Sequence, residues 1–207
     1  DAGLPPGDQT ELTGIFVGVG PSTYLINNLL ARSANYQRTT LVSCSEELQL
    51  LMSNAGDFLP TRIAYLLNCR GPAVNVQSAC STSLVAVHLA CQSLLAGECD
   101  LALAGCSTLK LPSDIGHTFE AGMPFSVDGH TRPFDQAASG TVFGSGIGAV
   151  ILKPVDLAMH DQDHIYAVIK GSAVNNDGRR RASFSAPGLD GQVAVLEEAL
   201  DLSGMLK

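Results

Sequence analysis

The sequence contains no tryptophan, and its 207 residues are only 5% aromatic and 15% charged. A charge content this low, beside 45% hydrophobic residues, excludes a disordered chain. The sequence has no Gly-X-Y period, which excludes collagen, and no apolar run approaches the about 18–20 residues that a membrane-spanning helix needs. No basic start followed by an apolar stretch marks a signal peptide. We therefore expect one globular domain in the cytosol, with no membrane partner.

Basic residues are scarce, with 12 Lys and Arg against 20 Asp and Glu and a net charge of −8. Because this charge repels a phosphate backbone, we expect no nucleic-acid partner. The single basic run is Arg179, Arg180 and Arg181. It is typical of a solvated loop, and the alternative is a contact with a phosphate-bearing or acidic partner.

The six cysteines contain no C-x-x-C spacing, which argues against a zinc ribbon or a thioredoxin-like motif, and we predict no metal site. The chain is larger than the small secreted scaffolds that depend on disulfides. Most of the cysteines lie among apolar residues, where a cysteine is usually a small buried hydrophobe. They are Cys44, Cys69, Cys80, Cys91, Cys99 and Cys106.

Apolar runs and helical spacings alternate along the chain. Short apolar runs predict strands at residues 14–19, 73–77, 100–106, 146–152 and 165–174. Spacings of three to four predict helices at residues 61–67, 81–96 and 192–200, with Gly97 ending the second. A strand, a helix and a strand in succession predict a parallel crossover, so the fold class is α/β with a mostly buried sheet.

Cys80 lies where the strand at 73–77 meets the helix at 81–96. A tight turn between a strand and a helix exposes a nucleophile, and the positive end of the helix dipole favours thiolate over thiol. Backbone N–H groups at the same place are suited to hold an oxyanion. We expect the small neighbours Ala79 and Ser81 to contact the substrate. A further buried cysteine is the alternative interpretation.

The sequence offers no obvious base for this thiol. His88 lies eight residues further on, about 12 Å along the same predicted helix, and is better explained as a packing residue. The other four histidines lie in predicted loops or near segment ends, and none has a carboxylate at a spacing that suggests a triad. They are His117, His130, His160 and His164.

Several long motifs follow one another along the chain. The segment around Cys80 reads ACSTSLVAVHLACQSL, followed by GECDLALAG. Further along come FSVDG, RPFD, GTVFGSGIGAVILK and AVIKGSAVNNDG. In this order the motifs resemble the β-ketoacyl synthases, above all the ketosynthase domains of modular type I polyketide synthases, and the resemblance covers nearly the whole chain.

The resemblance implies a thiolase-like fold of α-β-α-β-α layers, of which this chain is an incomplete portion, and a homodimer. It also implies that Cys80 is an acyltransferase nucleophile. Cys80 would accept an acyl chain from phosphopantetheine on an acyl carrier protein, for decarboxylative condensation with a malonyl-type extender. Other polyketide synthase domains, such as an acyltransferase and a ketoreductase, are implied as partners, and no bound cofactor is expected.

The resemblance further implies that residues 1–207 are an internal segment of one ketosynthase domain, and that the segment alone is inactive. The N-terminal part and the C-terminal half, with the His-Gly-Thr-Gly-Thr and later Gly-His motifs, are expected outside the segment. Departures from the family pattern are few: Gln77-Ser78 stand where Asp-Thr is common, and Thr82 where Ser is common.

Two features carry weaker expectations. Asp177 falls where many relatives have an acidic residue near the catalytic histidines, so it is a candidate for active-site support, with a structural loop carboxylate as the alternative. The stretch Leu50, Leu51 and Met52 lies near the dimer contact and acyl tunnel in the family, or is ordinary core.

The glycines of GTVFGSGIG are better explained by close packing of a central strand than by a nucleotide loop, because no Gly-Lys-Ser/Thr follows. Two other functions stay open for the whole chain. One is a non-catalytic thiolase-like scaffold segment, and the other is a cysteine hydrolase or plain thiolase.

Overall fold

A computed structural model describes residues 11–30, 45–113, 115–183 and 186–205. By internal contacts the chain divides into two compact units. The first comprises Asp1–Gly18, Leu59–Gly105 and Ala149–Lys207, and the second comprises Val19–Phe58 and Cys106–Gly148. Cys80 and Asp177 both belong to the first unit. Cys44 lies outside the described residues.

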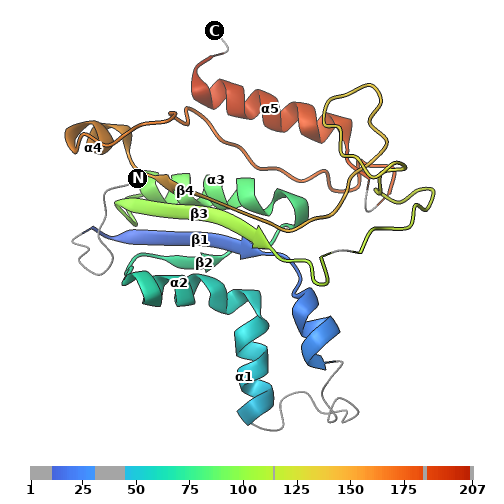
Figure 1. The fold of residues 1–207 in the computed structure, drawn as a ribbon. Coiled ribbons are helices and arrows are strands. Elements are labelled where there is room, and N and C mark those ends of the chain that lie inside the picture. Colours follow the sequence, from blue (N-terminus) through green and yellow to red (C-terminus); the bar gives the residue numbers. More distant parts are fainter. Residues whose placement is uncertain (1–10, 31–44, 114, 184–185, 206–207) are drawn as a thin grey trace. The chain divides into compact units, whose positions relative to one another are not determined.

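The centre of the fold is a four-stranded sheet in the order β2-β1-β3-β4 (Figure 1). The strands are β1 (Thr13–Val19), β2 (Ala73–Asn75), β3 (Leu101–Thr108) and β4 (Gly146–Leu152). β1 and β2 pair in parallel, with Phe16 opposite Val74. Four of the five predicted strands are therefore confirmed, although β2 is shorter than predicted.

Helices connect and flank the strands. The α-helices are α1 (Ser45–Asn54), α2 (Leu59–Leu67), α3 (Thr82–Leu95), α4 (Val155–His160) and α5 (Leu189–Ser203). Short helical turns are η1 (Leu25–Leu30), η2 (Gly56–Phe58) and η3 (Ala79–Ser81). The three predicted helices are confirmed as α2, α3 and α5. Gly97 follows α3 with φ +71°, a left-handed conformation that glycine adopts without strain, and it ends the helix as predicted.

Alternating side chains of β1 build two hydrophobic clusters. Phe16 packs with Ala86 and Ala90 of α3, whereas Ile15 and Val17 pack with Ala64 of α2. Because successive side chains of a strand point to opposite faces, α3 and α2 cover opposite faces of this sheet. Alanines on α3 let the helix approach the strands closely, and this packing fixes the start of α3, next to Cys80.

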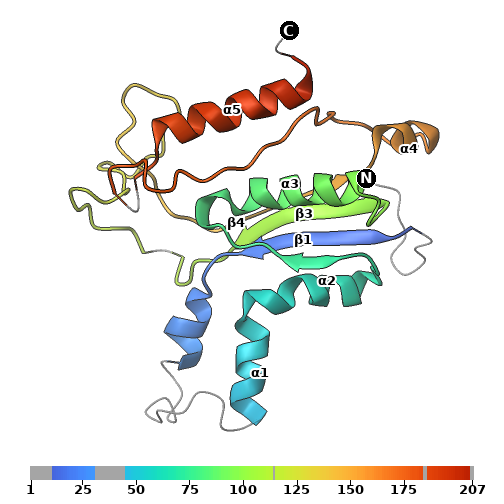
Figure 2. The ribbon, with the colours of Figure 1, turned by 180° about the vertical axis from the view of Figure 1, so that it is seen from behind.

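The predicted strand at residues 165–174 is wrong. These residues form no strand, and Figures 1 and 2 show them as a trace that runs along α5. A strand requires a hydrogen-bonded neighbour, and in the described part of the chain the sheet ends at β4. Gly171 lies so close to α5 that an added Cβ would come within 3.0 Å of the Ala199 carbonyl oxygen and the Ser203 N–H nitrogen.

Two further expectations change. β4 is an edge strand and not a central one, and nothing lies within 4 Å of an added Cβ at Gly146 or Gly148. Close packing therefore does not explain these two glycines. Leu51 and Met52 on α1 are 46% and 40% exposed, so the interpretation of this stretch as ordinary core is also wrong.

Candidate active site

Cys80 lies in the single turn η3, between β2 and the start of α3. The Val76 N–H donates to the Val17 carbonyl at 3.0 Å, which holds the chain on the sheet up to the turn. The next residues reverse direction, and Ala79 takes a left-handed conformation with φ +55°, which is unfavourable for a residue with a side chain. This strand-to-helix geometry confirms the predicted position of Cys80.

The turn, residues 78–82, is closed by hydroxyl groups, and we call it the elbow. The Ser78 N–H donates to Thr82 Oγ1 at 3.0 Å, and the Thr82 hydroxyl donates to the Ala79 carbonyl at 2.7 Å. The Ser81 hydroxyl donates to the Ser78 carbonyl at 2.9 Å. The Ser78 and Ala79 carbonyls also accept the backbone N–H groups of Ser81 and Thr82, so the hydroxyls add a second bond at each carbonyl. Together these bonds stabilise the conformation of Ala79.

The Thr82 side chain is only 4% exposed and lies against the sheet. A Cβ added at Gly18 of β1 would come within 3.0 Å of both Thr82 Cγ2 and the Val76 carbonyl oxygen. Gly18 is therefore needed for the close approach of the elbow to β1. Sequence reasoning noted Thr82 only as a departure from the family pattern, and it missed Gly18. The available signal was a glycine near the end of a predicted strand together with a β-branched residue soon after the cysteine.

Exposure separates Cys80 from the other cysteines. All five described cysteines are free, and Cys80 is exposed whereas Cys99 is buried and Cys69, Cys91 and Cys106 are partly buried. Burial raises the pKa of the Cys91 thiol, so Cys91 stays protonated at neutral pH. Cys80 also precedes the 14-residue helix α3, whose N-terminal dipole favours an anion. These features favour Cys80 as the reactive thiol.

The two neighbours of Cys80 lie in the same turn, as the sequence predicts. Ala79 contributes the left-handed backbone, and the Ser81 hydroxyl is engaged with Ser78. Both are exposed, so both are accessible to a substrate that reaches Cys80. Their expected contact with substrate stays a prediction.

Asp177 contacts the start of α5. Its Oδ2 accepts the Gly188 N–H at 2.9 Å, and its Oδ1 occupies the space that a Cβ on Gly191 would need. A carboxylate at a helix N-terminus is stabilised by the dipole and by the free N–H groups. These contacts support the interpretation of Asp177 as a structural carboxylate that anchors the loop before α5, and its role in the active site stays a prediction.

The histidines make contacts of their own. His88 Nδ1 lies 3.0 Å from Ser172 Oγ, which confirms it as a packing residue between α3 and the segment along α5. His160 and His130 contact Asp161 and Asp128, with side chains that are 84% and 70% exposed. Such exposed pairs contribute little stability.

Lys153, at the end of β4, forms ion pairs with Glu11, Asp161 and Asp163. The lysine side chain is 12% exposed. The hydrogen bond from Lys153 holds the pKa of Asp161 below its usual value, and bonds to Asp161 and Asp163 raise the pKa of Lys153. This cluster joins the end of β4 to the residues around α4 and before β1, and sequence reasoning missed it.

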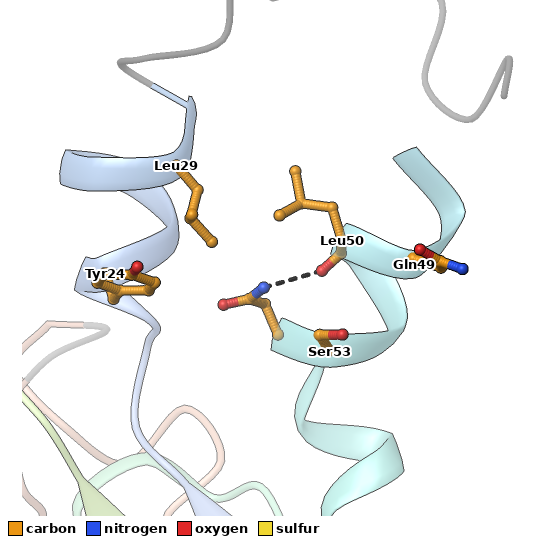
Figure 3. Close-up of a pocket in the computed structure, with 6 residues that line it drawn as sticks. Tyr24, Leu29, Gln49, Leu50 and Ser53 are labelled. Atoms are coloured by element: carbon orange, nitrogen blue, oxygen red, sulfur yellow. Dashed lines mark hydrogen bonds between the residues drawn. The ribbon is translucent and has the colours of Figure 1, made fainter. Parts of the chain in front are cut away.

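In the second unit an open pocket of about 480 Å³ lies between η1 and α1. Figure 3 shows Tyr24 and Leu29 on one side and Leu50 and Ser53 on the other. Asn54 also lines this pocket, and its side chain accepts the Ser22 hydroxyl at 3.1 Å and donates to the Leu50 carbonyl. Leu50, one of the three residues predicted near the acyl tunnel, thus lines a pocket.

Two kinds of feature are absent from the described part of the chain. Within the described ranges, no group of three or more His, Cys, Asp and Glu side chains is arranged to hold a metal ion. None of the helices described is both long enough and apolar enough to cross a membrane.

Two family models match the chain. The β-ketoacyl synthase N-terminal domain matches residues 1–158, and the β-ketoacyl synthase C-terminal domain matches residues 166–207. Among curated proteins, one of the phenolphthiocerol/phthiocerol polyketide synthase proteins of Mycobacterium tuberculosis is 47% identical over 206 residues, which are 99% of this chain and 14% of that protein. Polyketide synthase PksN of Bacillus subtilis is 43% identical over 143 residues, 69% of this chain and 3% of that protein.

Solved structures agree with the family models. Ketosynthase twelve of the bacillaene polyketide synthase from Bacillus amyloliquefaciens matches with a TM-score of 0.78 and 31% identity, over 93% of this chain and 32% of that one. The ketosynthase from module 1 of the bacillaene synthase of the same species matches with a TM-score of 0.71 and 34% identity, over 93% of this chain and 31% of that one. The chain thus spans about a third of each solved ketosynthase, and its fold is thiolase-like, as predicted. It belongs to the β-ketoacyl synthase family and matches the ketosynthase domains of modular polyketide synthases.

Proposed function

We propose that this chain supplies the acyl-accepting nucleophile of a ketosynthase that elongates a polyketide. Support comes from one observation above all: Cys80 is an exposed thiol on a strand-to-helix elbow, next to the N-terminus of α3. The family match indicates the class of reaction, and the elbow indicates which residue of this chain carries it out.

In the first step the Cys80 thiolate attacks the carbonyl carbon of an acyl thioester on the phosphopantetheine arm of an acyl carrier protein. A new bond forms between Cys80 Sγ and the acyl carbon, the bond to the carrier sulfur breaks, and the carrier thiolate leaves and takes a proton. A thiolate suits this exchange because it is both a good nucleophile and a good leaving group.

In the second step a malonyl-type extender on a carrier protein loses CO2, and the electron pair of the broken bond stays on its α-carbon. This carbanion attacks the acyl group on Cys80, the new carbon–carbon bond forms, and the bond to Cys80 Sγ breaks. The product is a β-ketoacyl thioester on the carrier. Decarboxylation needs charge stabilisation that we assign to the family's two histidine motifs, which do not belong to these 207 residues.

We further propose that residues 1–207 are an internal segment of one ketosynthase domain and do not condense on their own. The share of the solved ketosynthases that the chain spans supports this proposal. Its partners are then an acyl carrier protein, neighbouring synthase domains such as an acyltransferase and a ketoreductase, and a second ketosynthase copy in a homodimer. We also propose that the protein works in the cytosol, where cysteines stay reduced.

The test is condensation by the intact ketosynthase with Cys80→Ala, compared with Cys91→Ala as the matched control. We expect Cys80→Ala to lower product formation by about a thousandfold or more and to leave the melting temperature nearly unchanged, because an exposed thiol is lost without a cavity. Cys91→Ala should condense at close to the parental rate. Condensation by Cys80→Ala at the parental rate would refute the assignment, and an intact parent that never condenses would favour the scaffold interpretation.

A further inference from the structure

The Thr82 hydroxyl is the group that closes the elbow from inside the fold. It accepts the Ser78 N–H at 3.0 Å and donates to the Ala79 carbonyl at 2.7 Å. The side chain is 4% exposed, so water does not compete for either bond. One buried hydroxyl therefore holds a backbone group on each side of Ala79.

The Ala79 carbonyl belongs to the peptide group that joins Ala79 to Cys80. A peptide group is planar and trans, so its N–H points away from its carbonyl. The Ala79 carbonyl accepts the backbone N–H of Thr82 as well as its hydroxyl, so Thr82 holds this carbonyl with two bonds and thereby fixes the direction of the Cys80 N–H. The Thr82 methyl group has a separate contact, because Cγ2 lies against Gly18 of β1.

The conformation of Ala79 makes this restraint necessary. Its φ of +55° is unfavourable for alanine, so the turn persists only while other contacts hold it. Ser81 bonds to Ser78 alone, before the Ala79–Cys80 peptide, and it is exposed. Among the elbow hydroxyls with described bonds, that of Thr82 is the one that contacts the peptide of the nucleophile itself.

We propose that Thr82 is a positioning residue, whose hydroxyl orients the Ala79–Cys80 peptide. In this orientation the Cys80 thiol attacks the carbonyl carbon of the acyl group while the Cys80 N–H donates to the oxygen of the same carbonyl. This inference rests on the proposed acyl transfer to Cys80. An N–H that is already aimed stabilises the negative charge that develops on the carbonyl oxygen, without reorganisation during the reaction. The hydroxyl carries this role, and the methyl group serves only packing.

The experiment measures two rates at Cys80 in the intact ketosynthase, with adducts located by peptide mass. The first is acyl transfer from a small acyl thioester, which develops an oxyanion. The second is alkylation by iodoacetamide, which needs an accessible thiolate, as acyl transfer does, but develops no oxyanion. Thr82→Val keeps the methyl group and loses both hydrogen bonds of the hydroxyl, whereas Thr82→Ser keeps both hydrogen bonds. The third variant is Thr13→Val. Thr13 is a matched control because it is 3% exposed and its Oγ1 has no partner among the described residues.

For Thr82→Val we expect acyl transfer to fall by about tenfold while alkylation changes by less than about twofold. Thr82→Ser and Thr13→Val should keep both rates close to those of the parent. Three results would overturn the proposal: Thr82→Val acylated at the parental rate, its two rates falling by the same factor, or Thr82→Ser losing acyl transfer. The Thr82→Ser result tests the proposal even if Thr82→Val does not fold. A parent that is not acylated at Cys80 overturns the proposed function as well, whereas an acylated parent with an equally active Thr82→Val overturns the positioning role alone.

Discussion

Gly18→Ala tests how tightly the elbow is packed on the sheet. An added methyl would come within 3.0 Å of Thr82 Cγ2 and of the Val76 carbonyl oxygen. Non-bonded heavy atoms rest at about 3.5–4.0 Å, so both neighbours would have to move. Neither moves easily, because the Val76 oxygen is backbone and the Thr82 side chain is buried and held by two hydrogen bonds.

Overpacking of this kind costs about 1–3 kcal/mol, and we expect the upper end because one of the two contacts is with backbone. For a chain of this size each kcal/mol lowers the melting temperature by about 2–4 °C, and the fall is smaller in a longer domain. We therefore expect Gly18→Ala to lower the melting temperature of the intact ketosynthase by about 5 °C and to slow acyl transfer to Cys80. Gly116→Ala is the matched control, since nothing lies within 4 Å of its Cβ. A Gly18→Ala protein that melts with the control and reacts at the parental rate would refute the packing described for the elbow.

Three further changes test other contacts. Gly171→Ala should lower the melting temperature by several degrees, because its Cβ would clash with the Ala199 carbonyl of α5. Thr13→Val should raise the free energy of unfolding by about 1 kcal/mol, because it removes a buried hydroxyl that has no partner in the described part of the chain. Lys153→Met should destabilise the protein at pH 7. As the pH falls, the variant should then lose less stability than the parent. Lys153 lowers the pKa of Asp161, so its contribution is present above the unfolded carboxyl's pKa of about 4 and is lost as the pH falls.

Each of these outcomes has a clear opposite. A Gly171→Ala protein with the parental melting temperature would mean that the segment along α5 is not packed as described. A destabilised Thr13→Val protein would indicate a partner for the hydroxyl. Urea unfolding followed between pH 2 and pH 7 tests the Lys153 ion pairs, and parallel pH profiles for Lys153→Met and the parent would show that they contribute nothing.

The sequence predicted the elements whose stability is local or whose burial is regular. The α3 helix follows from apolar residues at spacings of three to four, and its end follows from Gly97. β1 follows from an apolar run that the structure buries on both faces. Cys80 was predicted from its place between such elements, because the position of a turn is known once the elements on each side are known.

Features that depend on distant neighbours were not predicted. Residues 165–174 have the pattern of a strand, but strand formation depends on a partner that the segment itself does not encode. Gly146 and Gly148 were assigned close packing, although β4 lies at the edge of the sheet. The bonds of Thr82 also escaped prediction, because its spacing in the sequence does not tell which backbone groups a hydroxyl will contact.

The most direct test of the central claim is to locate the acyl group after the acyl-transfer step. The intact ketosynthase is incubated with an acyl carrier protein that bears an acyl-phosphopantetheine thioester and without extender, and then digested and mapped by peptide mass. We predict one acyl adduct, on Cys80. An adduct on Cys91 or Cys106 with Cys80 unmodified would contradict the account.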